Sequence, residues 1–308
     1  MENQRPFSQS FLHFPAQNPD VLAKNRAQIG LQLDIANQLL IPRENGAVVE
    51  EDFETQRLKI EYRRGLGRGF EAAVSGQILA RNGGVLDQFL TTYHDLIGYG
   101  ADSDDNPQGR DSRPKNRAVF RFEDPNGRGV DVGRALGFGD TTLSLKKQIA
   151  RGKTASAARL ALKIPTGSDS EILGSGGFDA GISFDARREL SRKWAFFGNA
   201  SLLQFGSSAI PNARKNGWQG GLGLEWKVGR RDSVVAQFDA HSATVKTGNR
   251  FADDTPVVAS LGWKRRVSEG RSVWASFSEN GDWVNYNAAP LGNIGPDFTL
   301  SFGYEWRR

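Results

Sequence analysis

The sequence predicts an all-β protein, a transmembrane up-and-down antiparallel β-barrel of about twelve strands. Three observations predict this fold class. Apolar and polar residues alternate along many segments, the connections between these segments alternate in length, and aromatic residues cluster at the segment ends. Together they indicate short periplasmic turns, long extracellular loops and a location in the bacterial outer membrane.

Alternation with a period of two residues is clearest at the C-terminus. Between Phe298 and Trp306 every second residue is apolar or aromatic, and the residues between them are small or polar. Because side chains of a strand point alternately to its two faces, this pattern predicts strands with one apolar and one polar face. The predicted strands are 28–38, 55–64, 69–79, 138–149, 157–165, 177–187, 193–205, 217–228, 232–246, 256–266, 271–280 and 297–306.

The connections between the predicted strands alternate between short and long. This asymmetry is typical of an up-and-down barrel, whereas a soluble β-sandwich, the alternative fold, would seldom keep it through so many hairpins. The apolar faces also contain glycine and alanine where the core of a sandwich needs bulkier residues. The short connections are 65–68, 150–155, 188–192, 229–231 and 268–270, and the long ones are 39–54, 80–137, 166–176, 206–216, 247–255 and 281–296.

Composition limits the other classes of protein. The chain has 308 residues, a net charge of +5 and no cysteine, so disulfides and thiolate metal sites are excluded. The mean hydropathy of −0.50 does not argue against a membrane barrel, because the alternating faces cancel in the average. Acidic and basic residues are interspersed, which argues against a nucleic-acid partner. Met1 is not followed by the basic and apolar regions of an export signal, so we interpret the chain as a mature form.

Aromatic residues on the predicted outward faces are expected at the two membrane interfaces, where amphipathic rings are favoured. Most of them lie beside a short turn or the C-terminus and therefore indicate the periplasmic interface, while Trp218 lies at the opposite one. The predicted interface residues are Tyr62, Trp194, Trp218, Trp226, Trp263, Tyr304 and Trp306.

Folding the strands with their apolar faces outward places charged residues of both signs in the lumen. Such charges are expected to pair, since an unpaired buried ion is costly. Two interpretations therefore stay open: a salt-bridge and water network that fills a narrow lumen, or a polar pathway for small solutes. The predicted lumen-lining residues are Asp34, Lys59, Glu61, Arg63, Glu71, Arg159, Lys163, Asp179, Asp185, Glu225, Asp239, His241 and Glu305.

Two segments outside the regular strands are expected to matter for function. Residues 1–27 contain an apolar and aromatic cluster around Phe11, and we expect them to dock in the lumen or along its periplasmic rim. Residues 28–308 are expected to form the barrel. The longest connection, 80–137, is expected to be an extracellular lid with a small hairpin, because loops of this length are usually functional or disordered.

Enzymatic function is uncertain, and the sequence favours a protein that is not an enzyme. His241 is expected to share the inward face with Asp239, while Ser242 points outward and cannot exchange a proton with it. His94 lies beside Asp95 in the long connection, where such a pair is more often a surface or capping contact. No His, Cys or Asp spacing matches a metal site, so no cofactor and no metal are expected.

Three regions of the chain have familiar motifs. They are Leu58–Ile78; Tyr93–Leu96, followed by Gly109-Arg110-Asp111 and Pro114-Lys115-Asn116; and Leu160–Phe184, with Lys163-Ile164-Pro165-Thr166-Gly167. In these regions the chain resembles a family of proteobacterial predicted outer-membrane β-barrel proteins with a domain of unknown function. The resemblance implies the fold and the location, over nearly the whole chain, and it implies no catalytic residues. Many such barrels end on an aromatic residue, whereas Arg307 and Arg308 follow Trp306 here.

These features predict a narrow outer-membrane channel or transporter for small polar or ionic solutes. The alternative is a closed barrel with a structural or lipid-acting (hydrolase) role at the outer rim, around His94. The expected partners are the lipid bilayer with its lipopolysaccharide, the barrel-assembly machinery and a small solute.

Overall fold

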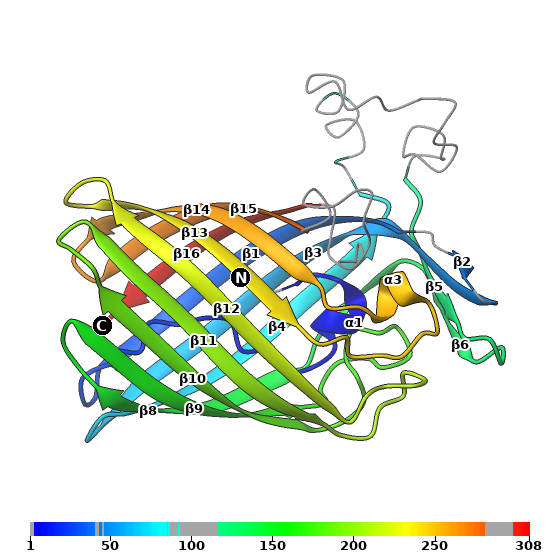
Figure 1. Ribbon diagram of the computed structural model, residues 1–308, viewed down its shortest axis with the longest axis horizontal. Helices are drawn as coiled ribbons and strands as arrows, with labels where there is room; N and C mark the ends of the chain where they lie inside the picture. Colours follow the sequence, from blue (N-terminus) through cyan, green and yellow to red (C-terminus); the bar gives the residue numbers. More distant parts are fainter. Residues whose placement is uncertain are drawn as a thin grey trace.

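Long antiparallel strands wind side by side into a closed barrel in the computed structural model of the chain (Figure 1). The structure describes residues 3–40, 43, 44, 46–84, 86, 92, 116–280 and 298–308. Among these residues, twelve strands form the barrel wall. They are β1 (Ala27–Leu40), β3 (Ala47–Gly67), β4 (Phe70–Asn82), β8 (Thr141–Ala150), β9 (Thr154–Ile164), β10 (Asp179–Glu189), β11 (Trp194–Phe205), β12 (Asn216–Lys227), β13 (Asp232–His241), β14 (Val257–Ser268), β15 (Arg271–Asn280) and β16 (Phe298–Arg307).

Each wall strand pairs with its neighbours along the chain, and the first pairs with the last. The register of β1 and β16 runs from Gln28 opposite Arg307 to Asn37 opposite Phe298. This pairing leaves the wall without a free edge, as a sheet in a membrane requires. The predicted all-β, up-and-down antiparallel barrel is confirmed.

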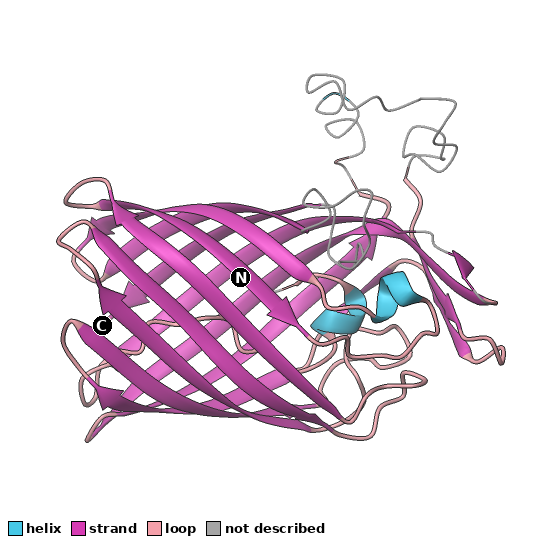
Figure 2. Ribbon diagram, in the orientation of Figure 1, coloured by secondary structure: helices cyan, strands magenta, loops and turns pink. Residues whose placement is uncertain are grey.

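The two ends of the barrel differ, as the predicted connections indicated. Tight turns join β3 to β4, β8 to β9, β10 to β11, β12 to β13 and β14 to β15 at one end, which we call the short-turn end (left in Figure 2). The short helices α1 (Pro6–Gln9) and α3 (Arg250–Asp253) lie at the opposite, long-connection end. Among the described residues, no helix has the length and apolar character needed to cross a membrane.

Several strand boundaries differ from the predicted ones. The prediction of a long connection over 39–54 is wrong, because β3 already begins at Ala47 and β2 (Arg43–Glu44) pairs with it. The predicted hairpin beyond the wall consists of β5 (Val119–Glu123) and β6 (Gly129–Val132), but β5 also pairs with Val48–Asp52 of β3. The hairpin therefore continues the wall sheet outward instead of standing alone.

Two predicted strands also have different limits. The predicted strand 138–149 is interrupted at Gly139 and Asp140, which separate β7 (Ala135–Phe138) from β8. Both pieces pair with β4. The predicted strand 232–246 ends at His241, because residues beyond it pair with the 212–214 connection instead of the neighbouring strand.

The distribution of apolar residues is inverted relative to a soluble protein. Large apolar side chains are exposed on the outer surface of the wall, and polar side chains are buried inside it. Such a surface fits a hydrocarbon solvent and not water. Examples of the exposed residues are Leu31, Leu33, Ile60, Leu160, Leu202, Leu222, Phe238, Leu261 and Phe302.

Candidate functional site: the lumen and its plug

The N-terminal segment runs through the inside of the barrel. At the short-turn end the Leu22 amide donates to Glu71 of β4 at 2.9 Å. At the long-connection end Asn3 contacts His241, the last residue of β13, at 3.2 Å between Nδ2 and Nε2. Residues 3–26 therefore span the lumen lengthwise, and we call them the plug.

Wall side chains bind the plug mainly through its backbone. The carboxylate of Asp179 accepts from the Leu12 amide at 2.9 Å, and the Gln219 side chain accepts from the Phe14 amide at 2.8 Å. The Asn199 amide group donates to the carbonyl of Phe14, also at 2.8 Å. These contacts satisfy backbone amide and carbonyl groups of a segment that pairs with no described strand.

Apolar packing closes the long-connection end around the first part of the plug. Phe7 lies edge-on to Phe120 and Phe122 of β5, with ring centroids 4.9 and 5.7 Å apart. Phe11 packs on Phe205 in the same way, at 4.9 Å. The extension of β3, the β5 strand and the end of β11 thus form an apolar mouth that receives the aromatic residues of the plug. The core cluster comprises Phe7, Phe11, Leu12, Phe14, Val49, Phe53, Phe120, Phe122, Ile172, Leu203, Phe205, Ile210, Val245 and Ala252.

A buried ion pair fixes the plug within this mouth. Arg5 Nε lies 2.6 Å from Glu51 Oε1, and their side chains are 2% and 0% exposed. Breaking such a pair leaves an uncompensated buried charge, which costs about 3–5 kcal/mol. The apolar mouth and this pair together hold the start of the plug in place.

All predicted lumen-lining residues lie on the inward side of the wall. Eight of them are fully buried, namely Asp34, Glu71, Arg159, Lys163, Asp179, Asp185, Asp239 and His241. Lys59, Glu61, Arg63, Glu225 and Glu305 are half-buried.

The inward charges pair with one another. Arg57 lies 2.7 Å from Asp34, and Lys146 lies 3.0 Å from Glu71. Lys163 contacts Asp140 and, at 3.3 Å, Asp179. The wall and the plug remove these charges from water, and the pairing offsets the free-energy cost of this desolvation.

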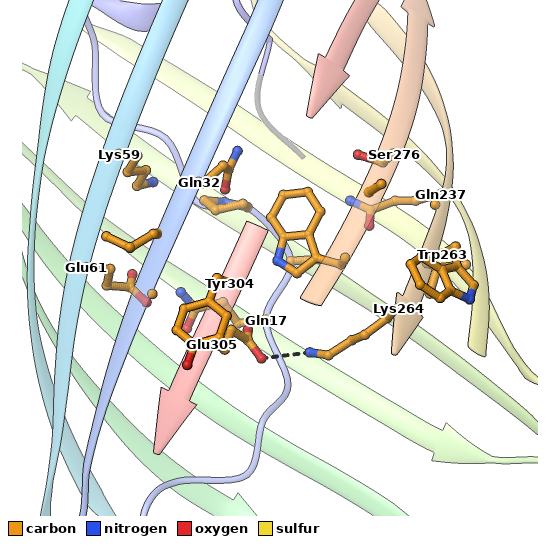
Figure 3. Close-up of a pocket in the computed structure, with 18 of the residues that line it drawn as sticks. Gln17, Gln32, Lys59, Glu61, Gln237, Trp263, Lys264, Ser276, Tyr304 and Glu305 are labelled. Carbon is orange, nitrogen blue, oxygen red and sulfur yellow. Dashed lines mark hydrogen bonds and ion pairs between the residues drawn. The ribbon is translucent and has the colours of Figure 1, made fainter. Parts of the chain in front are cut away.

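An open cavity of about 320 Å³ lies beside the plug in the short-turn half of the lumen (Figure 3). Its lining includes the amides of Gln17, Gln32 and Gln237, and the ion pair between Lys264 and Glu305, which are 2.8 Å apart. We call it the main cavity. Its volume lies at the lower end of the range of about 300–1,000 Å³ for small-molecule pockets.

A second space of about 40 Å³ lies nearer the long-connection end, lined by Asn3, His13 and Arg57. Lys59 lines both spaces, so they follow one side of the plug along the lumen. The plug therefore narrows the lumen strongly without filling its short-turn half.

The main cavity has an indole in its wall. Trp274 lies three residues before Phe277, whose side chain is exposed on the outer surface. Because side chains alternate between the two faces of a strand, Trp274 belongs to the inward face of β15. A Cβ on the neighbouring Gly303 would stand 2.0 Å from Trp274 Cε2, so the ring lies directly against this glycine. The bare backbone of Gly303 makes room for the indole.

The predicted interface aromatics lie on the outer surface. Tyr62, Trp194, Trp218, Trp226, Trp263 and Trp306 are exposed by 37–44%, and Tyr304 is half-buried. Trp194 and Trp226 stack at 5.6 Å with an interplanar angle of 11°.

Some residues of the site do not appear among the predicted ones. Arg57 lies two residues before Lys59 on β3 and therefore on the same face of the strand. The alternation alone thus identifies Arg57 as a lumen-lining residue. The alternation identifies Trp274 as an inward residue in the same way, because its neighbours on β15 point outward. The identity of the wall residues that bind the plug has no signal in the sequence. His94, the centre of the alternative lipid-acting role, lies outside the described residues, so that role stays a prediction.

Comparisons with known proteins place the chain in a family. The family described as Protein of unknown function (DUF3187) matches residues 1–307. The chain belongs to the DUF3187 family. A search of curated protein sequences finds no match.

Solved structures similar to this DUF3187 protein are outer-membrane barrels. The COG4313 outer membrane channel from Pseudomonas putida F1 has a TM-score of 0.60 and 12% identity, covering 96% of this chain and 100% of that one. The KdgM porin has a TM-score of 0.46 and 6% identity, with coverage of 91% and 98%. The first likeness shows that the fold is that of an outer-membrane β-barrel.

Proposed function

We propose that this DUF3187 protein is an outer-membrane channel for small polar solutes, and that the described conformation is its closed state. One observation supports this most strongly: the plug threads the lumen lengthwise yet leaves the main cavity open beside it. A barrel with only a structural role has no need of a solute-sized cavity. The similarity to a solved outer-membrane channel agrees with the proposal.

The lining of the main cavity favours a polar solute with one apolar face. Lys264 pairs with Glu305 and Arg63 pairs with Glu61. Lys59 also lines the cavity, so charged groups surround the amides of Gln17, Gln32 and Gln237. The indole of Trp274 offers an apolar surface among them. A small polar ring compound with hydrogen-bonding edges fits this combination of groups.

Single-channel recording in a planar bilayer tests the proposal. Gln219→Ala with Thr244→Val removes two plug anchors, since Gln219 accepts from the Phe14 amide and Thr244 donates to the Phe7 carbonyl. Neither residue belongs to an ion pair of the described wall. We expect low, intermittent conductance in the wild type and more frequent opening in this variant.

Two controls complete the recording. Gln204→Ala changes an exposed residue away from the plug and should behave as the wild type. Deletion of residues 1–14 removes the part of the plug in the apolar mouth and should give a larger, steady conductance. A folded barrel that stays silent in both plug variants would contradict a channel function.

The same proposal places the protein in the outer membrane, with the short-turn end in the periplasm. The exposed apolar belt would contact the bilayer and, on the outer side, lipopolysaccharide, and the barrel-assembly machinery would insert it. Separation of outer and inner membranes followed by immunoblotting tests the location. Recovery of the protein in the soluble or inner-membrane fraction would contradict it.

A further inference from the structure

The mouth of the barrel at the short-turn end is lined by basic residues. The plug divides it into two concavities. One, of about 740 Å³, is lined by Arg26 of the plug and by Arg231, Arg266 and Arg307 of the wall and its turns. The other, of about 500 Å³, is lined by Lys24, Arg68 and Arg151, and also by Asp20, which accepts a hydrogen bond from Gln148.

Among the residues that the structure describes, these cations have no carboxylate partner, unlike those of the lumen. Within the described part of the chain, none of the four arginines of the larger concavity forms an ion pair. Arg266 donates to the carbonyl of Arg230 at 2.9 Å, and Arg307 donates to the side chain of Gln28 at 2.6 Å. Both contacts leave the positive charge uncompensated. Glu269 also lines this concavity, without an ion pair to any described residue.

The four arginines come from separate parts of the fold. Arg26 precedes β1, Arg231 lies in the turn before β13, Arg266 lies near the end of β14, and Arg307 ends β16. The barrel therefore gathers like charges that repel one another, and an anion between them would relieve this repulsion. Guanidinium groups bind phosphate oxygens through paired hydrogen bonds.

We propose that the larger concavity is a binding site for the phosphate group of an anionic ligand. Two sources of such a group reach this end of the barrel: a phosphate-bearing solute in the aqueous phase, and the headgroup of an anionic phospholipid in the adjoining leaflet. The site requires no conduction through the lumen and is separate from the proposed channel function.

Calorimetric titration of the full chain in dodecyl maltoside with inorganic pyrophosphate tests the aqueous source. Arg231→Gln with Arg266→Gln should weaken pyrophosphate binding by about tenfold or more, since it removes two of the four charged contacts. Lys215→Gln with Lys246→Gln removes the same charge from exposed positions at the long-connection end and should leave binding unchanged. A mobility shift on heating confirms that each variant is folded.

Native mass spectrometry tests the lipid source. Protein extracted from vesicles of equal parts phosphatidylcholine and phosphatidylglycerol should retain phosphatidylglycerol, and the Arg231/Arg266 variant should retain less of it than the Lys215/Lys246 control. A loss confined to one assay identifies the source and supports the site. If the arginine variant matches the wild type in both assays, or if the lysine control loses as much, the proposal is overturned.

Discussion

Arg159 and Asp185 form an ion pair with each other and one hydrogen bond each with the plug, using the same two atoms. Arg159 Nη2 lies 3.0 Å from Asp185 Oδ1. The same nitrogen donates to the carbonyl of Pro15 at 2.8 Å, and the same oxygen accepts from the amide of Gln17 at 3.2 Å. The side chains are 4% and 0% exposed, so the wall and the plug share one buried polar network.

Arg159→Met should therefore destabilise the barrel more than removal of the whole pair. The single change leaves the Asp185 carboxylate buried without its cation, at a cost of about 3–5 kcal/mol. The double change Arg159→Met with Asp185→Leu removes both charges and should recover part of this loss. Denaturant unfolding in detergent measures the difference, with the exposed Arg188→Met as control. A double variant at least as unstable as the single one would contradict the ion-pair argument.

The contact between Gly303 and Trp274 predicts opposite outcomes for two glycine substitutions. Gly303→Ala places a Cβ against the indole and should cost about 1–3 kcal/mol through overpacking. At Gly76 a Cβ would meet no atom within 4 Å, so Gly76→Ala should be tolerated. Unfolding midpoints of the two variants test this. Equal midpoints would show that the indole does not pack on Gly303.

The stacked rings of Trp194 and Trp226 should be coupled energetically. Aromatic pairs of this kind contribute about 0.5–1.5 kcal/mol beyond the area that they bury. A double-mutant cycle with Trp194→Ala and Trp226→Ala in lipid vesicles should give a coupling of this size. The same cycle for Trp226 and Trp263, which lie two strands apart, should give a value near zero. Equal coupling energies in both cycles would contradict a contribution from stacking and would attribute the coupling to the bilayer interface.

The hairpin of β5 and β6, beyond the barrel wall, should loosen in acid. Hydrogen bonds from the Asn212 side chain and the Arg128 amide hold the pKa of Asp124 well below its usual range. A lowered folded-state pKa stabilises the hairpin above the unfolded-state pKa of about 4, and this stabilisation is lost as the pH falls further.

Hydrogen exchange measures this effect. At neutral pH, Asp124→Asn should raise exchange in 119–132, because the amide lacks the charge that Arg128 and Asn212 bind. Near pH 2.5 the difference between the wild type and the variant should be smaller than at neutral pH, once intrinsic exchange rates are corrected, because protonation of Asp124 in the unfolded state removes part of its stabilisation. A difference that does not change with pH would show that the charge of Asp124 is not involved.

The wall strands were predictable because a membrane barrel repeats one simple rule along each strand. The segment 217–228 alternates cleanly, and β12 runs from Asn216 to Lys227. The rule fails where a strand leaves the wall: the first part of β3 packs on β5 and the plug, and its pattern depends on partners distant in sequence.

The inward position of the charged residues follows from the same rule, but the groups that they contact do not. The sequence placed Asp179 and Asp185 inside, where they were expected either to pair with cations or to line a pathway. Both carboxylates also accept hydrogen bonds from plug amides. No pattern in residues 1–27 indicates which wall residue each amide meets, because backbone groups are the same at every position.

The wall binds the plug chiefly by main-chain groups from Leu12 to Leu22, and this has a consequence for how the segment tolerates change. Replacing a side chain in this stretch leaves the bonded amides and carbonyls in place. Adding or removing a single residue shifts every later amide by one position against a fixed set of wall acceptors. Spacing, more than residue identity, thus determines whether residues 12–22 fit their barrel.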